Sequence, residues 1–556
     1  PSHQPAARQD KTEPSMGSRN ELALAVAAGV GIGIAGAYLC ASSFATKPPK
    51  DEKVPRAVRQ ALETVKVQVH HDDDLARKRE TRNSREQSGN PATQTPTTPG
   101  TPTNSSSHLA AHHLSTWQDD ENKHEVWPRP EAQRKNLVLN PMGLARPHMH
   151  FLNPNEKVMG QVLQNDSKAA YRSHALDGGA IRGNACKHIW WEPSKVRAGM
   201  VTCGGLCPGL NSIIQGVTNC LFRDYGVRDI VGITAGYSGL SDPDHHAHIK
   251  LTPELVKEVH MKGGSILKAG RGGFDAPKIC AKLRELGINM LFVIGGDGTQ
   301  FAGHLLYEEA RKQKLEISVV GVPKSIDNDV LFVDRTFGFD SAVEAAAGVI
   351  RNGWVEASSC DKGVGIVKLM GRDAGFVAAH AALASNLVDL VLVPEVEVNM
   401  NDVLAHVDSV LAKKGNMVIV VAEGAGQAHV ATGKKDASGH TIYGDIGIYL
   451  RDTINAYLKP KGGRTFYIDP SYIIRSCPIT PIDHIYCSRL ANNAVHTAMR
   501  GYTGVCVGAI HNIIVILKSK LIASGKKQLK IKSSTWQTCV QNCAMPDNLT
   551  GMKAKV

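Results

Sequence analysis

Two aspartates and a lysine follow an apolar run within a few residues. The run ISVVGV, residues 317–322, ends at Pro323, and Lys324, Asp327 and Asp329 come next. Asp327 suits a base that takes a hydroxyl proton during phosphoryl transfer, Asp329 suits metal or water placement, and Lys324 suits the charge of a transferring group. In extended chain the two aspartates, two apart, would point the same way. An Asx turn after a strand is the alternative.

A glycine-rich loop that contains an acid follows a second apolar run. GGDGTQ, residues 295–300, comes after MLFVI and opens a helical pattern. Glycines let the backbone approach a ligand closely, and the helix N-terminus favours phosphate. Asp297 fits beside phosphate if a divalent metal lies between them, because Mg²⁺ binds one or two carboxylates together with phosphate oxygens. Asp297 as a simple helix cap remains an alternative.

Two further loops have the composition of a phosphate site. CGGLCPGLN, residues 203–211, places Gly204 and Gly205 before a helical pattern, and GRGG, residues 270–273, places Arg271 between glycines. Arginine is suited to forked contact with phosphate. Together these loops indicate a polyphosphate pocket, although each one alone is also an ordinary turn. The sequence has no GxxxxGK[ST] motif, so it is not a P-loop enzyme.

The elements that would hold these loops repeat along the chain from about residue 197. Continuous apolar runs end in glycine loops and are followed by helical patterns, as in AGMVT, MLFVI, VGIVKLM and MVIVVA. This rhythm predicts an α/β fold with parallel sheet covered on both faces. Ligands of such folds bind at the carboxyl ends of strands, where all these loops lie.

The first 135 residues differ in composition from the rest. An uncharged run, residues 22–46, is long enough as a helix to cross the ~30 Å core of a bilayer. A membrane anchor, a targeting segment and a soluble helix are all open interpretations. Residues 47–135 are charged and then rich in Pro, Thr and Ser, so they predict a disordered linker. The GxGxxG of residues 31–36 lacks strand–turn–helix context and is taken as a chance match.

Charge and cysteine content narrow the class of protein. The 556-residue chain has a net charge of +12, and residues 1–130 hold 16 Lys/Arg against 15 Asp/Glu, so the excess lies in the globular part. A basic globular region suits anionic small molecules. No basic stripe with interleaved aromatics and no nucleic-acid-binding signature is present, so we expect no nucleic-acid partner. The 12 scattered cysteines lack zinc-site spacing and suit reduced thiols.

The sequence resembles the 6-phosphofructokinase family, and most closely the ATP-dependent enzymes of plants and trypanosomatids. The matching motifs, in the family's order between about residues 197 and 508, are CGGLCPGLN, GGSILKAGRG, GGDGTQ, PKSIDNDV, FGFDSA, KLMGRDAGF, AEGAG, YIDPSYIIRS and IYCSRLANNAVHTAM. The resemblance implies two Rossmann-like lobes with mainly parallel sheets. It also implies phosphorylation of fructose 6-phosphate by Mg·ATP in glycolysis, allosteric control, and a homotetramer in which a neighbouring subunit supplies some sugar-site residues.

The resemblance assigns roles to individual residues. The implied catalytic residues are Lys324, Ser325, Asp327, Asp329 and Arg372, with Asp327 as the base and Ser325 and Asp329 helping to position phosphate and metal. Asp297 matches the Mg²⁺-site acid. The implied nucleotide-side positions are Gly204, Gly205, Arg271, Gly296, Asp297, Gly298 and Thr299. The implied sugar-phosphate positions are Ser325, Asp327, Met370, Gly371, Arg372, Glu423, Tyr472 and Arg475.

The phosphoryl donor depends largely on one position. Pyrophosphate-using relatives carry Asp where Gly298 stands, and a carboxylate there would crowd and repel the inner phosphate of a nucleotide, so Gly298 favours ATP. Lys324 is shared with pyrophosphate enzymes, which keeps that donor as an alternative. Phe466 stands where relatives commonly have Lys, with Arg464 two residues away, and the C-terminal NCAMPD departs from the family pattern.

Two other classes of function compete with this interpretation. NAD kinases and lipid kinases also carry GGDGT after a strand, but SIDNDV followed by KLMGRDAGF is not expected in them. A non-catalytic regulatory paralogue would be expected to lose a chemical group, and Asp297, Asp327, Asp329 and Arg372 are all present.

The resemblance also predicts how the chain is divided. After the extension, residues 136–195 form an embracing segment, 196–340 an ATP-binding lobe, 341–475 a fructose 6-phosphate-binding lobe, and 476–556 return to the first lobe and end in a tail. We expect the catalytic part in the cytoplasm, with membrane anchoring through residues 22–46 or plastid targeting left open.

Overall fold

The computed structural model describes residues 138–145, 151–152, 156–159, 179–433 and 442–552. These ranges belong to one compact unit, residues 105–556. The predicted hydrophobic segment 22–46 and linker 47–135 lie outside the described residues. None of the helices in the described ranges is long and apolar enough to cross a membrane.

The larger sheet has nine strands in the order β2-β3-β15-β14-β9-β8-β5-β6-β7. Its five central strands, β6, β5, β8, β9 and β14, run parallel, and the strands outside them pair antiparallel. The strands are β2 (Lys157–Val158), β3 (Ala180–Arg182), β5 (Arg197–Thr202), β6 (Asp229–Ile233), β7 (Ile249–Lys250), β8 (Met290–Gly295), β9 (Ser318–Pro323), β14 (Val505–Ile510) and β15 (Ile513–Lys518).

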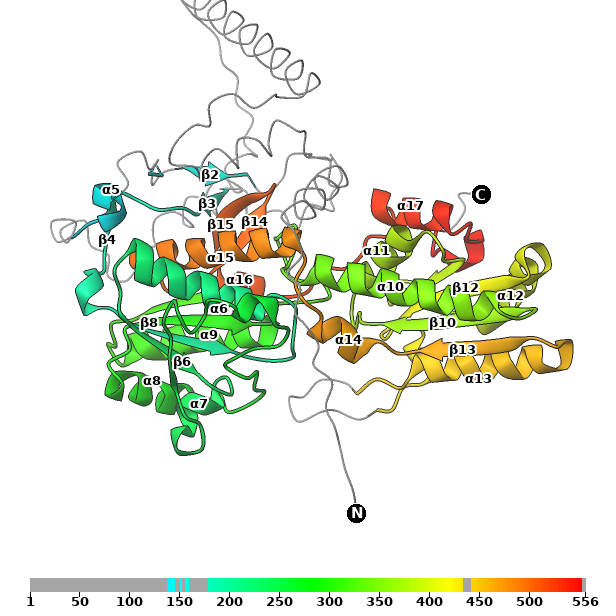
Figure 1. The fold of residues 1–556 in the computed structure, drawn as a ribbon, viewed down its shortest axis with the longest axis horizontal. Helices are drawn as coiled ribbons and strands as arrows, with labels where there is room; N and C mark the ends of the chain where they lie inside the picture. The colour runs from blue at the N-terminus through cyan, green and yellow to red at the C-terminus, as the bar shows by residue number, and fades with distance from the viewer. Residues whose placement is uncertain (1–137, 146–150, 153–155, 160–178, 434–441, 553–556) are drawn as a thin grey trace, which may run out of the picture. The chain divides into compact units, whose positions relative to one another are not determined.

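Helices cover both faces of this sheet (Figure 1). On one face α6 (Leu210–Asn219) and α15 (Pro481–Met499) pack together over buried residues of β5, β8 and β9. On the other face, α8 (Ala276–Glu285) and α9 (Asp297–Lys312) bury a second core. Strands β8 and β9 are buried along their whole length, as expected for parallel strands that are covered on both sides.

The smaller sheet has four parallel strands in the order β11-β12-β10-β13. Its strands are β10 (Gly363–Leu369), β11 (Leu390–Leu392), β12 (Asn416–Ala422) and β13 (Arg464–Ile468). Figure 1 shows α10 (Phe339–Ser358) above these strands and α13 (Ile446–Leu458) below them. The remaining helices of this part are α11 (Phe376–Ser385), α12 (Met400–Lys414), α14 (Ser471–Ser476) and α17 (Ser534–Asn542).

The two sheets are joined through a contact between α15, which packs on the larger sheet, and α10, which packs on the smaller one. Asp483, in the first turn of α15, is fully buried and accepts hydrogen bonds from the backbone N–H of Ser341 (2.8 Å) and from its Oγ (2.7 Å). Ser341 lies in the first turn of α10. These hydrogen bonds hold the first turns of α10 and α15 together.

A two-stranded pair completes the described strands. In it, β1 (Val138–Leu139) pairs antiparallel with β4 (His188–Ile189). Helix α5 (Pro141–Ala145) follows β1 along the chain. The predicted division into an embracing segment, two lobes and a returning tail remains a proposal. The predicted α/β class with mainly parallel sheets is confirmed.

Candidate active site

A cavity of about 460 Å³ lies where the strands of both sheets end. The loops that follow β5, β8 and β9 of the larger sheet contribute to its wall, and so do those that follow β10, β12 and β13 of the smaller one. Its lining residues are Gly205, Leu206, Arg271, Gly296, Asp297, Lys324, Ser325, Ile326, Asp327, Asp329, Lys368, Met370, Arg372, Glu423, Asp469, Ser471, Tyr472, Arg475 and Lys526.

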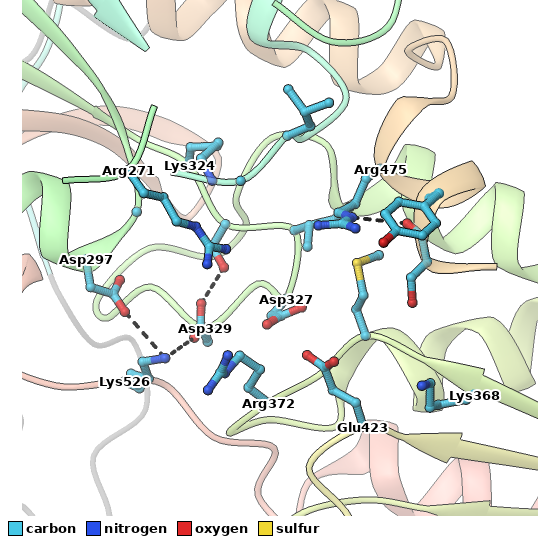
Figure 2. A pocket seen from close by; sticks show the side chains of 18 of the residues that line it. Arg271, Asp297, Lys324, Asp327, Asp329, Lys368, Arg372, Glu423, Arg475 and Lys526 are labelled. Atoms are coloured by element: carbon cyan, nitrogen blue, oxygen red, sulfur yellow. Dashed lines mark hydrogen bonds and ion pairs between the residues drawn. The ribbon is translucent and has the colours of Figure 1, made fainter. Parts of the chain in front are cut away.

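Most of the predicted site residues meet in this cavity. Figure 2 shows Asp297 and Asp329 toward one end, Glu423 and Arg475 toward the other, and Asp327 between them. Four predicted positions are not part of the lining: Gly204, Gly298, Thr299 and Gly371. Gly204 and Gly371 lie in loops beside lining residues, whereas Gly298 and Thr299 lie in the first turn of α9, directly after the lining residue Asp297.

The loop after β9 is a turn, and this corrects the expectation of extended chain. Residues 326 and 327 lie in a turn, and Asn328 has a φ of 57°, in the left-handed region. The Asn328 side chain accepts a hydrogen bond from the backbone N–H of Thr336 (3.1 Å), and Ser325 donates from Oγ to the Asp329 carboxylate. Asp327 and Asp329 both face the cavity because of this turn, and not because of strand alternation.

Asp327 is half-buried, and one of its two carboxylate oxygens is buried without a partner. Its Oδ1 has no hydrogen-bond partner among the described residues, so a local Asx turn does not account for this side chain. Burial raises its pKa to about 7, and the nearby carboxylates of Asp329 and Glu423 act in the same direction. A carboxyl group with a pKa near neutrality is suited to accept and release a proton.

Asp297 does not cap the helix that it begins. Gly296 is the N-cap of α9 and makes no side-chain cap, Asp297 is the first residue of the helix, and its Oδ1 is buried without a partner. Burial raises the pKa of Asp297 to about 6, with the charge of Asp329 as a second cause. The alternative of Asp297 as a helix cap is therefore wrong.

Cations lie beside the glycine loops at the same end of the cavity. A Cβ built on Gly204, whose φ is 84°, would lie 3.7 Å from Lys324 Nζ, and one on Gly205 would lie 3.7 Å from an Arg271 guanidinium nitrogen. The backbone N–H of Gly204 donates to Gly270 O (2.8 Å), which holds the two predicted phosphate loops side by side. These loops can therefore present both N–H groups and positive charge to one anion.

The other end of the cavity combines cations with the carboxyl groups of Glu423 and Asp469. Burial raises the pKa of Glu423, while the positive charges of Arg372, Lys368 and Arg475 oppose the rise. The Arg475 guanidinium lies 5.0 Å from the ring centre of Tyr472, and its Nε donates to Ser471 O (3.2 Å). This end is suited to hold a second anion and to hydrogen-bond hydroxyl groups.

Several lining residues were not predicted from the sequence, most clearly Lys526, Lys368 and Asp469. Lys368 and Asp469 lie inside the motifs KLMGRDAGF and YIDPSYIIRS, so a closer examination of those motifs could have found them. Lys526 lies in GKKQLKIK near the C-terminus, where no motif marks it. Phe466, which the resemblance marks as a departure from the family pattern, is outside the lining, and the Arg464 guanidinium lies 5.5 Å from its ring centre.

The carboxylates fit a magnesium ion that is shared with a phosphorylated ligand. Asp297 has a buried oxygen without a partner, Asp329 lines the same end of the cavity, and Mg²⁺ prefers carboxylate oxygens. Within the described ranges no three His, Cys, Asp or Glu side chains form a group that could hold a metal alone.

The chain is similar to known phosphofructokinases. The phosphofructokinase family model matches residues 197–498. The chain is 41% identical over 410 residues to ATP-dependent 6-phosphofructokinase 5, chloroplastic, of Arabidopsis thaliana, covering 71% of this chain and 76% of that protein. It is 40% identical to an ATP-dependent 6-phosphofructokinase of Borreliella burgdorferi, covering 71% of this chain and 91% of that protein.

The solved structures agree on the fold. A pyrophosphate-dependent phosphofructokinase from Marinobacter aquaeolei superposes with a TM-score of 0.53 at 20% identity, covering 63% of this chain and 91% of that one. A likeness at this identity speaks for the fold only. The predicted resemblance and the predicted enzyme class are confirmed by the family match and the relatives at about 40% identity, and the chain belongs to the phosphofructokinase family.

Proposed function

We propose that this chain is an ATP-dependent 6-phosphofructokinase of glycolysis. It would transfer the γ-phosphoryl group of Mg·ATP to the 1-hydroxyl of fructose 6-phosphate, giving fructose 1,6-bisphosphate and ADP. The observation that carries the proposal is one cavity that joins glycine loops and Asp297 at one end to a cationic end with Lys368 and Arg475 at the other (Figure 2). The relatives at about 40% identity, which are named as ATP-dependent 6-phosphofructokinases, support the same choice.

Asp327 is placed in this proposal as the general base. It lies between the two ends of the cavity, where the acceptor hydroxyl has to meet the donor (Figure 2). As the O–P bond to the sugar forms and the bond to the β-phosphate oxygen breaks, the hydroxyl proton passes to the Asp327 carboxylate. Lys324 and Arg372 would offset the negative charge of the transferring group, and Ser325 holds Asp329 through its hydroxyl.

Magnesium would supply charge neutralisation between the phosphates and the acidic end of the cavity. Asp297 would hold it, with help from Asp329. The other predicted ligand contacts fall into two groups, one at each end of the cavity. The nucleotide side would use Gly204, Gly205, Arg271, Gly296, Gly298 and Thr299, and the sugar-phosphate side would use Met370, Gly371, Glu423, Tyr472 and Arg475.

ATP is preferred over pyrophosphate because of the space around Gly298. A Cβ built on Gly298 meets nothing within 4 Å, so the space there is open to a ligand. Pyrophosphate as the donor remains the second candidate, since Lys324 lines the cavity as it would in such enzymes. A non-catalytic regulatory role is disfavoured because the acids and Arg372 all line one cavity.

The proposed assembly is a homotetramer, and the proposed location of the catalytic part is the cytoplasm. The chloroplastic name of one relative makes plastid targeting through the extension an alternative. A role of residues 22–46 in membrane anchoring would have to be tested on the full chain.

The direct test compares initial rates with ATP and with pyrophosphate, using fructose 6-phosphate as the acceptor. We expect ATP to be the faster donor, and a faster reaction with pyrophosphate would reverse the donor assignment. Asp327→Asn should keep ATP binding and lose at least ~10²-fold in turnover, which is what acid–base groups contribute. Unchanged turnover would remove Asp327 as the base.

A further inference from the structure

Lys526 reaches the acidic end of the cavity from a part of the chain that the motifs do not mark. Its Nζ lies 3.3 Å from an Asp329 oxygen, 3.7 Å from an Asp297 oxygen and 2.5 Å from an Asp373 oxygen. Figure 2 shows its ammonium group between Asp297 and Asp329. The three carboxylates follow three different strands, β8, β9 and β10, so one lysine joins loops of both sheets.

The backbone around Lys526 sets the direction of its side chain. Lys526 forms an antiparallel bridge with Val330, and the Lys527 N–H donates to Asp329 O (2.7 Å), so this segment is tied to the loop that carries Asp329. Neighbouring side chains of an extended segment point to opposite sides. Lys527 accordingly turns away and donates to Val333 O (3.0 Å) and Asp334 O (3.2 Å).

An ammonium group and a magnesium ion would compete here for the same two carboxylates. Lys526 contacts one oxygen of Asp297 and one of Asp329, which are the carboxylates proposed to hold the metal. A unit positive charge between these ligands opposes the entry of a second cation. Asp373 offers Lys526 a third partner that is outside the proposed ligand pair, so the ammonium group can stay paired when the other two are taken by metal.

We propose that Lys526 is a built-in counter-ion of the metal site, which keeps free divalent metal out of it until the metal arrives bound to nucleotide. This inference rests on the proposed metal site at Asp297 and Asp329. Metal bound to nucleotide brings negatively charged phosphates that can pair with the displaced ammonium group, whereas free metal brings only positive charge. The free enzyme would then hold its carboxylates together without a metal ion.

The test measures binding of Mn²⁺ alone to the full chain, without nucleotide, by electron paramagnetic resonance of the free ion. Lys526→Met should bind Mn²⁺ at least ~10-fold more tightly than the original chain, because a like charge within 4 Å of the site is removed. Lys526→Arg keeps a cation and should bind as the original chain does. Lys530→Met changes an exposed lysine on the same segment and is the matched control.

Two results would overturn the proposal. One is Mn²⁺ binding by Lys526→Met that is equal to or weaker than that of the original chain; the other is a gain that survives when Asp297→Asn is added, since the gained ion would then sit elsewhere. If Lys526→Met does not fold, Lys526→Gln provides the same comparison with a polar side chain. The binding measurement uses no substrate and does not depend on catalytic activity. An original chain without phosphofructokinase activity would refute the proposed function, whereas the Mn²⁺ affinities would still test the role of Lys526.

Discussion

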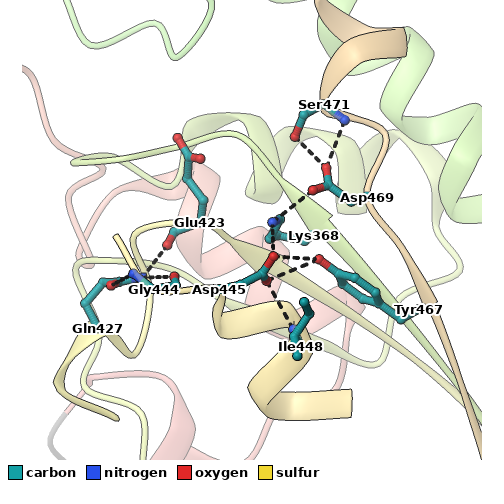
Figure 3. Close-up of polar contacts among 9 residues, drawn as sticks. All are labelled: Lys368, Glu423, Gln427, Gly444, Asp445, Ile448, Tyr467, Asp469 and Ser471. Carbon is teal, nitrogen blue, oxygen red and sulfur yellow. Dashed lines mark hydrogen bonds and ion pairs between the residues drawn. The ribbon is translucent and has the colours of Figure 1, made fainter. Parts of the chain in front are cut away.

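The ammonium group of Lys368 lies 2.9 Å from a carboxylate oxygen of Asp469, and this ion pair joins the end of β10 to the segment that leads into α14. Lys368 also pairs with Asp445 (2.7 Å), the residue that caps α13, and Asp445 accepts a hydrogen bond from Tyr467 (3.2 Å). Figure 3 shows these contacts as one network. Asp469 in turn accepts from the backbone N–H of Ser471 (3.0 Å), at the start of α14.

Removing Lys368 should weaken sugar-phosphate binding more than it slows chemistry. Helix α14 carries Tyr472 and Arg475, which are proposed to contact fructose 6-phosphate, and its start would lose the cation that holds Asp469 in place. We expect Lys368→Met to raise the KM for fructose 6-phosphate roughly tenfold, because small displacements of positioning groups are costly, with a smaller change in kcat. Steady-state kinetics with each substrate varied would show it.

Lys461→Met is the matched control for that variant. Lys461 also pairs with a carboxylate, that of Asp408 (2.8 Å), but its ion pair is outside the cavity lining. An exposed pair of this kind contributes little, so kinetics should be unchanged. Equal effects of the two substitutions would mean that Lys368 acts through general stability and not through α14.

The raised pKa of Asp327 predicts both the pH dependence of the reaction and that of stability. The base has to be ionised, so kcat/KM for fructose 6-phosphate should fall as pH drops below about 7. Because the folded-state pKa lies above the usual value of 3.8, the folded protein binds this proton more tightly than the unfolded chain, and stability is lost as pH rises from about 4 to about 7.

Asp327→Asn should therefore be less active and more stable above pH 7. We expect an increase in the free energy of unfolding on the order of 1–3 kcal/mol at pH 8 and little change at pH 3, where the carboxyl group is mostly protonated in both states. Chemical denaturation at the two pH values would measure it. A variant that is destabilised equally at both would contradict the assigned ionisation of Asp327.

The strand ends, and with them most of the cavity, followed from sequence pattern. Apolar runs ending in glycine loops located Gly296, Asp297 and Lys324, because parallel strands present their carboxyl ends at one edge. Two features depended on tertiary structure. The turn at Asn328 needs the hydrogen bond from Thr336, and Lys526 is one lysine of a basic run whose position depends on pairing with Val330. No local period or motif encodes either contact.

Gly298→Asp should shift the donor preference away from ATP without disturbing the fold. The site of the new Cβ meets nothing within 4 Å, and an acid in the first turn of α9 suits the helix dipole, so stability should be kept. A carboxylate there would repel the inner phosphate of a nucleotide. We expect at least a ~10-fold loss in kcat/KM for ATP from one such like-charge contact, and a smaller loss for pyrophosphate.

Gly298→Ala is the control, because it adds volume without charge and should retain most activity with ATP. An equal loss in both variants would assign the effect to crowding alone.

The proposed homotetramer predicts a role for apolar side chains at α14 and the start of α15. Tyr472, Ile473, Ile482 and Ile485 are between 61% and 81% exposed, and Ile482 and Ile485 share one side of α15. Exposed apolar side chains gathered in this way mark interaction surfaces. The double substitution Ile482→Glu and Ile485→Glu should shift the sedimentation coefficient of the tetramer toward smaller species. Leu255→Glu, at another exposed apolar residue, should leave the sedimentation coefficient unchanged.

Because Tyr472 lines the cavity beside this surface, loss of the tetramer should also raise the KM for fructose 6-phosphate. An original chain that sediments as a monomer at working concentrations would refute the proposed assembly.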